Sequence, residues 1–219
     1  MLYSVSDDIH KCIGSEMDFK TVYRVLESRK FYVFSDAEIA AFFPEEKKEN
    51  ISIYLSRWAK SGRLARLRKG IYELTYPARR VIPDLYIANK LYSPSYVSME
   101  TALSRYGLIP EVAMECVSLT VKTSRNFTNE YGSFVYHSIQ PEAFNGYRNE
   151  NHGGFEITIA SPEKALVDYF YFKKRKGVKG EALIERMNMK AVEKLQKKAM
   201  ERYAGYYKMN LKELLYAKS

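Results

Sequence analysis

The fold is decided by residues 35–72, SDAEIAAFFPEEKKENISIYLSRWAKSGRLARLRKGIY. Ser35 is placed to cap a short helix, and Glu38 stands three residues later, at the spacing of a capping box. Pro44 ends that helix because its ring removes a backbone donor and clashes with the preceding turn. The pattern then predicts a second helix over residues 49–61, which stops at Gly62.

Two short extended pieces follow this second helix, at residues 64–67 and 71–76. They are joined by the tight turn Arg68-Lys69-Gly70, whose glycine allows the turn conformation. A helix from Asp18 to Ser28 and an apolar piece at residues 31–34 precede them, and we expect that piece to pair with the two extended segments. The order helix, strand, helix, helix, hairpin is typical of a winged helix-turn-helix.

The second helix of this motif has two different faces at about 100° per residue. Its apolar side chains share one face, which we expect to be buried: Ile51, Tyr54, Leu55 and Trp58. The opposite face carries hydrogen-bonding groups, cations and one isoleucine, which suits the base edges of a DNA major groove. The predicted DNA-contacting residues on this face are Ser52, Ile53, Ser56, Arg57 and Lys60. In the hairpin we expect contacts to phosphate or the minor groove from Arg66, Arg68 and Lys69.

The net charge of +9 is unevenly distributed along the chain. Residues 57–80 hold eight basic residues against Glu73 alone, and residues 171–219 hold 14 basic against five acidic, whereas residues 83–170 are net acidic. Neutralising phosphate supplies most of the non-specific affinity for DNA, so this distribution favours a nucleic-acid partner for the motif. A polar helix face is also typical of plain solvated surface, and winged helices also dock proteins, so binding of an acidic protein is the alternative.

A Pro-bounded linker, residues 76–83, separates the motif from the rest of the chain. Its Arg79 and Arg80 suit either a phosphate backbone or plain solvation. The sequence therefore predicts a winged helix-turn-helix domain over residues 17–78 and a second domain over residues 84–219.

The second domain is predicted to be a small α+β unit, a mostly antiparallel sheet with helices packed on it. Helices are expected from Asp84, as N-cap, to Tyr92, over residues 97–106, and from Ser161-Pro162 onward, where Pro suits the first helical position. Three strands are expected at residues 115–122, 134–139 and 155–160, with the polar stretch 144–154 as a loop. Helical patterns over residues 181–204 and 211–217 complete a basic tail.

Two clusters of cations in this tail are open to two interpretations. Residues 173–176, KKRK, are ordinary chemistry for a helix C-terminus and also suit a second nucleic-acid contact. A stripe of Lys and Arg suits solvent, DNA or an acidic protein surface: Lys190, Lys194, Lys197, Lys198 and Arg202.

Catalytic and metal sites are not expected. The three histidines, His10, His137 and His152, are scattered, and there is no Gly-rich phosphate loop or Cys/His cluster. Glu156, Glu163 and Lys164 lack the strand spacing of a nuclease site, and Glu163 suits the start of a helix. Cys12 and Cys116 are expected to be reduced thiols. No run is apolar enough to span a membrane and the start is not that of a signal peptide, so we expect a cytoplasmic chain without cofactors.

Three segments resemble the AbiEi-type antitoxins, regulators of bacterial type IV toxin–antitoxin and phage-defence (abortive infection) systems. They are YVSMETALSRYGLIPE (96–111), the segment from Phe127 to Gly146, and ITIASPEKALVDYFYF (157–172), and the motif ending RLRKGIYEL (66–74) is similar too. The resemblance covers about residues 17–204, and the tail after Ala204 matches poorly.

The resemblance implies a repressor with two partners. Its winged helix would bind inverted repeats of double-stranded DNA in its own promoter, and the residues named above would contact that DNA. Its second domain would counter a nucleotidyltransferase-like toxin, often without forming a stable complex. Many relatives lack a neighbouring toxin, so the resemblance implies DNA binding more firmly than antitoxin activity.

Overall fold

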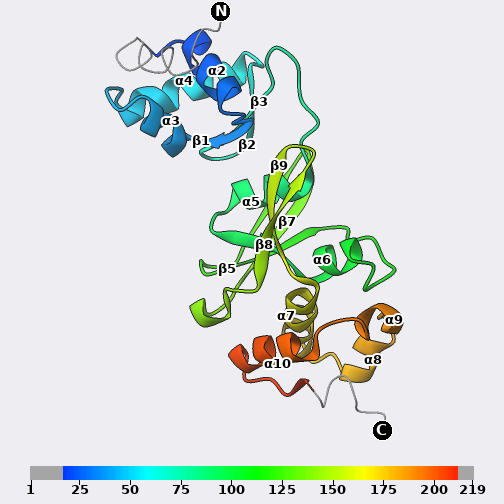
Figure 1. The fold of residues 1–219 in the computed structure, drawn as a ribbon. Coiled ribbons are helices and arrows are strands. Elements are labelled where there is room, and N and C mark those ends of the chain that lie inside the picture. The colour runs from blue at the N-terminus through cyan, green and yellow to red at the C-terminus, as the bar shows by residue number, and fades with distance from the viewer. Residues whose placement is uncertain (1–16, 212–219) are drawn as a thin grey trace, which may run out of the picture. The chain divides into compact units, whose positions relative to one another are not determined.

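The computed structural model describes residues 17–211 and is a mixed α+β protein, as predicted. The chain divides into two compact units between Val81 and Ile82. In Figure 1 the first unit runs from blue to cyan and the second from green to red.

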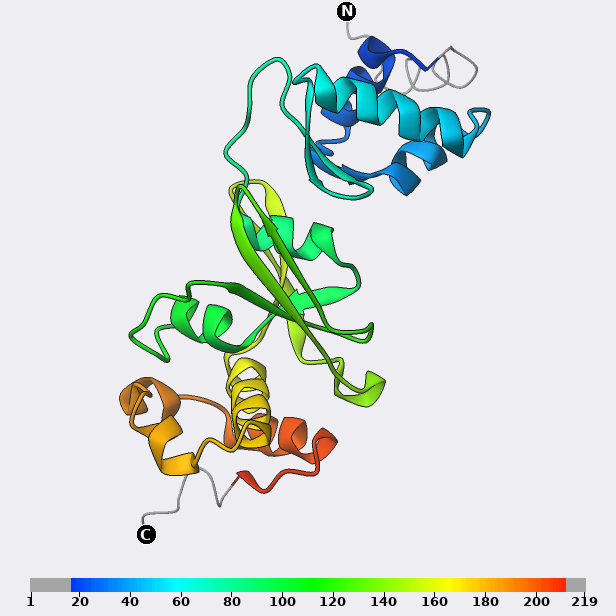
Figure 2. The ribbon, with the colours of Figure 1, turned by 180° about the vertical axis from the view of Figure 1, so that it is seen from behind.

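Residues 17–81 of the first unit form three helices and a small antiparallel sheet with the strand order β1-β3-β2. Its elements are α2 (Phe19–Ser28), β1 (Val33–Ser35), α3 (Asp36–Phe42), α4 (Lys48–Lys60), β2 (Leu64–Arg68) and β3 (Ile71–Leu74). The predicted pairing of the apolar piece with the hairpin is confirmed, because β1 pairs with β3 with Val33 opposite Glu73. Figure 2 shows the β2–β3 hairpin of this unit from behind.

Side-chain caps mark the starts of α2 and α3, as the sequence predicts. The Asp18 carboxylate accepts a hydrogen bond from the backbone N–H of Thr21 at 2.7 Å. Ser35 and Glu38 form the complete capping box, with Ser35 Oγ accepting from Glu38 N at 3.0 Å and Glu38 accepting from Ser35 N at 2.6 Å. The capping box begins α3 directly after β1, which sets the angle between the sheet and the helices.

One apolar cluster joins the helices of the first unit to its sheet. Its largest fully buried side chains are those of Met17, Leu26, Phe34, Ile39, Ile51 and Leu55. The face of α4 that we expected to be buried forms part of this cluster.

The second unit contains a six-stranded sheet with the order β6-β7-β5-β4-β9-β8. Its strands are β4 (Ser95–Val97), β5 (Cys116–Thr120), β6 (Arg125–Asn129), β7 (Gly132–Ser138), β8 (Tyr147–His152) and β9 (Phe155–Ala160). Three neighbouring pairs are antiparallel, while β5–β7 and β4–β9 are parallel, so the sheet is mixed with an antiparallel majority.

Helices of the second unit pack on this sheet and on one another. They are α5 (Asp84–Leu91), α6 (Met99–Arg105), the short 3-10 helix η1 (Pro141–Ala143), α7 (Pro162–Arg175), α8 (Gly180–Ile184), α9 (Met189–Val192) and α10 (Lys197–Tyr206). Helix α5 packs on β4, β5 and β9, and α7 packs against α6, α8 and α10. Figure 1 shows α7 leading out of the sheet, with α8–α10 gathered around it.

Several predictions for the second unit are wrong. The helix expected from residue 97 begins at Met99, and Ser95–Val97 forms β4 instead. The expected loop 144–154 contains β8, whose backbone pairs with β9 although its side chains are polar. Pro83, not Asp84, is the N-cap of α5, and Asp84 is its first helical residue.

The expected helix over residues 181–204 is three separate helices. The breaks coincide with hydrogen bonds to distant elements: Asn188 N donates to Leu108 O at 2.9 Å, and Gln196 N donates to Glu163 at 3.3 Å. These contacts remove the two residues from continuous helical pairing, which the sequence pattern could not reveal. The expected helix over residues 211–217 lies, apart from Leu211, outside the described residues, as do Cys12 and His10.

Candidate nucleic-acid interface

Helix α4 separates a buried face from an exposed face. Ile51, Leu55 and Trp58 are buried, as predicted, and the Tyr54 ring stacks on Trp58 with ring centroids 5.9 Å apart. The predicted contact residues lie on the other side, where Ser52, Ile53, Arg57 and Lys60 are exposed and Ser56 is half-buried. Ile53 is 55% exposed, an unusual amount for an isoleucine in the middle of a helix.

Arg57 has a fixed neighbour on this face. Its guanidinium lies 5.9 Å from the centroid of the Tyr54 ring, at the edge of cation–π range. The stem of Arg57 is thus supported by a ring that is itself packed against the core, while its donors face outward. Such an arrangement lowers the entropy cost of presenting a guanidinium to a partner.

The hairpin turn is held against the start of α3. Gly70 adopts φ +77°, and a Cβ at this position would come within 2.9 Å of an Asp36 carboxylate oxygen. Asp36 N donates to Gly70 O at 3.1 Å, and Arg68 donates to Lys69 O at 2.7 Å. The backbone conformation therefore favours glycine here, and a larger residue would in addition have to displace the Asp36 carboxylate.

The cations of the hairpin differ in exposure. Arg66 and Lys69 are exposed, whereas Arg68 is half-buried and its guanidinium is used by the turn. A register irregularity lies between Arg66 and Arg68. Because α4 packs on β2, the exposed face of α4 and these cations belong to neighbouring elements. Contact of any of these residues with DNA stays a prediction.

The two arginines of the linker pair with carboxylates of the first unit. Arg79 donates to both oxygens of Glu73, at 2.9 and 2.8 Å, and the Glu73 side chain is fully buried in β3. Arg80 pairs with Glu27 and lies 4.3 Å from the centroid of the Tyr32 ring. A buried carboxylate needs a cationic partner, so Arg79 has a structural role. This role is neither of the two considered from the sequence, contact with a phosphate backbone and plain solvation.

The second unit buries a cluster of polar side chains that sequence reasoning missed. Asp168 Oδ1 pairs with the Lys164 ammonium, and both side chains are fully buried. Tyr207 donates to the same oxygen at 2.5 Å, and the other oxygen accepts from Ser98 at 2.7 Å and from Tyr96 at 3.2 Å. We call Tyr96, Ser98, Lys164, Asp168 and Tyr207 the buried cluster.

Burial dominates the electrostatics of the buried cluster. It lowers the pKa of Lys164, an effect that the charge of Asp168 opposes, and it raises the pKa values of Tyr207 and Tyr96. The residue after Ser98, Met99, is buried with φ +52°, a conformation that costs a residue with a side chain about 1–2 kcal/mol. Ser98 and the Lys164–Asp168 pair come from two of the segments quoted above, so those segments meet in space.

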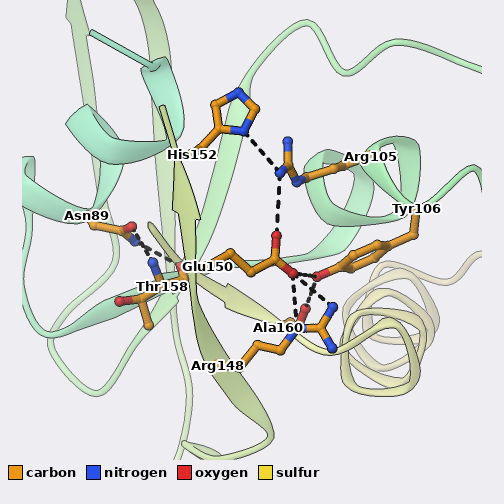
Figure 3. A network of polar contacts seen from close by, with 8 residues as sticks. All are labelled: Asn89, Arg105, Tyr106, Arg148, Glu150, His152, Thr158 and Ala160. Atoms are coloured by element: carbon orange, nitrogen blue, oxygen red, sulfur yellow. Dashed lines mark hydrogen bonds and ion pairs between the residues drawn. The ribbon is translucent and has the colours of Figure 1, made fainter. Parts of the chain in front are cut away.

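A second polar network lies at the sheet edge, where β8 faces α6 (Figure 3). Glu150 accepts from Tyr106 at 3.2 Å and from Arg148 at 3.0 Å, and it pairs with Arg105 at 3.4 Å. Burial and the charge of Glu150 raise the pKa of Tyr106 to about 12. Because each charge is paired, the network is a structural tie between α6 and β8.

Residues considered for catalysis have structural contacts instead. The Lys164 ammonium is buried in the cluster, Glu163 accepts from Gln196 N, and Glu156 accepts from Asn149 at 2.9 Å. His137 stacks on Phe172 with ring centroids 5.0 Å apart, and burial lowers its pKa. Within residues 17–211, no group of three His, Cys, Asp or Glu side chains could hold a metal ion.

Among the helices of residues 17–211, none has the length and apolar character that crossing a bilayer requires.

Comparisons with known proteins bear on the first unit. A search among curated proteins found none that matches this chain. A protein-family model described as "Transcriptional regulator, AbiEi antitoxin" matches residues 22–75, which run from α2 to the end of β3 and so contain α4 and the hairpin. The match confirms the resemblance for the first unit and supports a DNA-binding regulator of a toxin–antitoxin system. Residues 22–75 of the first unit are thus similar to the AbiEi antitoxin family of transcriptional regulators.

Proposed function

We propose that the first unit is a winged helix-turn-helix, that α4 enters the major groove of double-stranded DNA, and that the β2–β3 turn contacts the adjacent backbone. The observation that carries the proposal is the outward face of α4, where Ile53, Arg57 and Lys60 are exposed, while Ile51, Leu55 and Trp58 on the opposite face are buried. Buried apolar side chains fix the helix, so its polar face is presented in a constant orientation to a partner.

The proposed regulation is autoregulation. The protein represses its own operon by binding inverted repeats in its promoter, in the cytoplasm. Residues 17–78 form the DNA-binding domain, and residues 84–219 form a domain that counters a nucleotidyltransferase-like toxin encoded alongside. The family match to residues 22–75 supports the regulatory part of this proposal.

A gel-shift titration with the DNA upstream of the gene tests repression. The full chain is expected to bind an inverted repeat there, with an affinity that falls steeply as salt rises because phosphate contacts release counterions. A scrambled fragment of equal length and composition is the control. Absence of salt-sensitive binding to any inverted repeat upstream would remove the proposal.

Antitoxin activity requires a separate experiment. Co-expression of the full chain with the product of an adjacent nucleotidyltransferase-like gene is expected to restore growth that the toxin alone arrests. A chain ending at residue 81 is the comparison, and equal rescue by that shorter chain would assign the activity to the first unit instead.

Docking of an acidic protein is the second candidate. The exposed lysines at residues 190, 194, 197 and 198 favour it, because they form a cationic surface in the second unit that the DNA-binding proposal does not use. Co-purification of a neighbouring gene product that survives nuclease treatment would support it. Loss of the partner after nuclease treatment would instead favour nucleic acid as the ligand of these lysines.

A further inference from the structure

The first unit contains a pocket of about 580 Å³ beside the start of α2, on residues that the DNA-binding proposal does not use. Its volume lies within the range of small-molecule sites in proteins. Its lining combines aromatic rings with charged side chains: Asp18, Phe19, Lys20, Tyr23, Arg24, Arg63 and Tyr76. We call these seven residues the aromatic pocket.

Three rings form the apolar part of the aromatic pocket. The Tyr76 ring meets Phe19 edge-on with centroids 5.5 Å apart and Tyr23 edge-on at 5.7 Å. Tyr76 is 49% exposed, and both of the other rings are half-buried. Partly exposed rings held by their neighbours give a planar ligand a surface on which to stack at little entropy cost.

The charged part of the aromatic pocket selects an anion. Lys20, Arg24 and Arg63 are exposed, and none of the ion pairs among the described residues involves them. The Arg63 guanidinium lies 4.9 Å from the centroid of the Phe19 ring, so it borders the stacking surface. Three cations face one carboxylate, Asp18, which already accepts the Thr21 N–H. This balance opposes a cationic ligand, although three rings alone would suit one.

We propose that the aromatic pocket binds a mononucleotide, with the base stacked on the rings and the phosphate held by the cations. Aromatic side chains stack on any base because every base has a π face, and guanidinium and ammonium groups are the usual partners of phosphate. The site lies within the first unit and does not depend on whether the protein represses its operon.

The chain contains a built-in reporter for this site. Trp58 is the single tryptophan of the 219 residues, and its ring lies edge-on to Phe19 with centroids 5.3 Å apart. A base that stacks in the aromatic pocket changes the surroundings of Phe19 and, through it, those of Trp58. Trp58 also belongs to α4, so occupancy of the pocket would be sensed at the helix with the outward cationic face.

Titration of the full chain with AMP and with GMP tests the proposal, with Trp58 emission and calorimetric heat as two readouts. Both nucleotides are expected to give saturable changes, and higher salt is expected to weaken them. Adenosine and inorganic phosphate are the controls and are each expected to bind at least about tenfold more weakly than AMP, since each lacks one half of the recognised group. Binding of either control as tight as that of AMP overturns the proposal, as does the absence of heat and emission change with both nucleotides.

Three variants assign the binding to the aromatic pocket. Tyr76→Leu removes an exposed ring and is expected to weaken AMP binding about tenfold, the loss of one stacking contact. Lys20→Gln is expected to weaken AMP several-fold and to leave adenosine binding unchanged. Lys47→Gln removes an exposed cation of the same unit outside the pocket and is expected to bind as the parent does. Parent-like AMP binding by both Tyr76→Leu and Lys20→Gln would place the ligand elsewhere and overturn the assignment.

Discussion

The outward face of α4 and the buried cluster of the second unit use the same kinds of side chain in opposite ways. On α4, Arg57 and Lys60 are exposed, and their charges are available to a partner. In the buried cluster, Lys164 and Asp168 are fully buried, and Tyr207, Tyr96 and Ser98 occupy the remaining hydrogen-bonding positions. A charge at the surface costs little and can recognise a ligand, whereas a buried charge is tolerated only when each of its neighbours is in place. Substitutions on the outward face of α4 should therefore weaken binding, whereas substitutions in the buried cluster should reduce the stability of the fold.

The largest effect is expected from Asp168→Ala. It leaves the Lys164 ammonium buried without its counter-charge, which should lower the free energy of unfolding of the second unit by about 3–5 kcal/mol. Denaturant unfolding followed by tyrosine signals measures it, while Trp58 emission reports only on the first unit and should show an unchanged midpoint.

A double variant keeps this prediction testable if the single variant fails to fold. Lys164→Met with Asp168→Leu removes both charges and should be closer to the parent in stability than Asp168→Ala. If Asp168→Ala changed the unfolding free energy by less than about 1 kcal/mol, as exposed ion pairs do, the cluster would be solvated rather than buried.

The next effect concerns DNA selectivity. Arg57→Ala should reduce discrimination between the operator and other sequences by about 1–3 kcal/mol, whereas Lys69→Ala should weaken binding to all sequences about equally and reduce the salt dependence by about one charge. Gel shifts with matched and scrambled DNA at several salt concentrations measure both. Lys122→Ala, a cation of the second unit, is the control. Parent-like binding by both test variants would mean that α4 is not the recognition element.

A smaller effect is expected at the hairpin turn. Gly70→Ala should destabilise the first unit by about 1–2 kcal/mol because φ +77° is unfavourable for alanine, and it should cost more than Gly62→Ala because the added Cβ must displace the Asp36 carboxylate. Gly62→Ala is a matched control, since Gly62 has φ +74° but a Cβ there would meet nothing within 4 Å. Trp58 emission in denaturant measures both. An equal cost at the two positions would show that the contact with Asp36 adds nothing.

The smallest effect is expected from alkaline pH acting on the network of Figure 3. The pKa of Tyr106 is raised to about 12 in the folded protein, against about 10 for an unperturbed tyrosine. The folded state therefore holds this proton more tightly, so the contribution of Tyr106 to stability is complete below pH 10 and is lost as pH rises from 10 to 12.

Tyr106→Phe is the variant that isolates this contribution. The denaturant concentration at the unfolding midpoint of the parent should fall as pH rises from 10 to 12, and Tyr106→Phe should make that fall less steep. Identical slopes would mean that the phenol–carboxylate contact is open to water. The raised pKa values of the buried cluster's tyrosines act in the same direction and remain in both proteins.

The sequence predicted those elements whose determinants are local. The capping box at Ser35, the glycine turn at residue 70 and the apolar face of α4 each lie within a few residues, and each stands as expected. Prediction from the sequence failed for the elements whose structure depends on contacts with residues far away in the chain. The polar strand β8 exists because β9 supplies its backbone partners, and the segment after α7 breaks where Asn188 and Gln196 bond to distant elements.

The same distinction between local and distant determinants explains which parts of the candidate site could be predicted from the sequence. The direction of each side chain on α4 follows from helical periodicity, so its exposed set was predictable. The burial of Lys164 and Asp168 was not, because an i, i+4 pair on a helix usually indicates a solvated ion pair. Their partners are distant in the chain: Tyr207, for example, is 39 residues after Asp168.

The position of β8 also bears on how copies of this protein avoid one another. β8 is an outermost strand of the six-stranded sheet, so one side of its backbone is open to pairing with a strand of another molecule. Its side chains are charged or polar, and Arg148 and Glu150 are tied to α6 in the network of Figure 3. An added strand would have to accommodate charges that are already paired with α6, so the residues that hold α6 in place also make this border of the sheet a poor template for another strand.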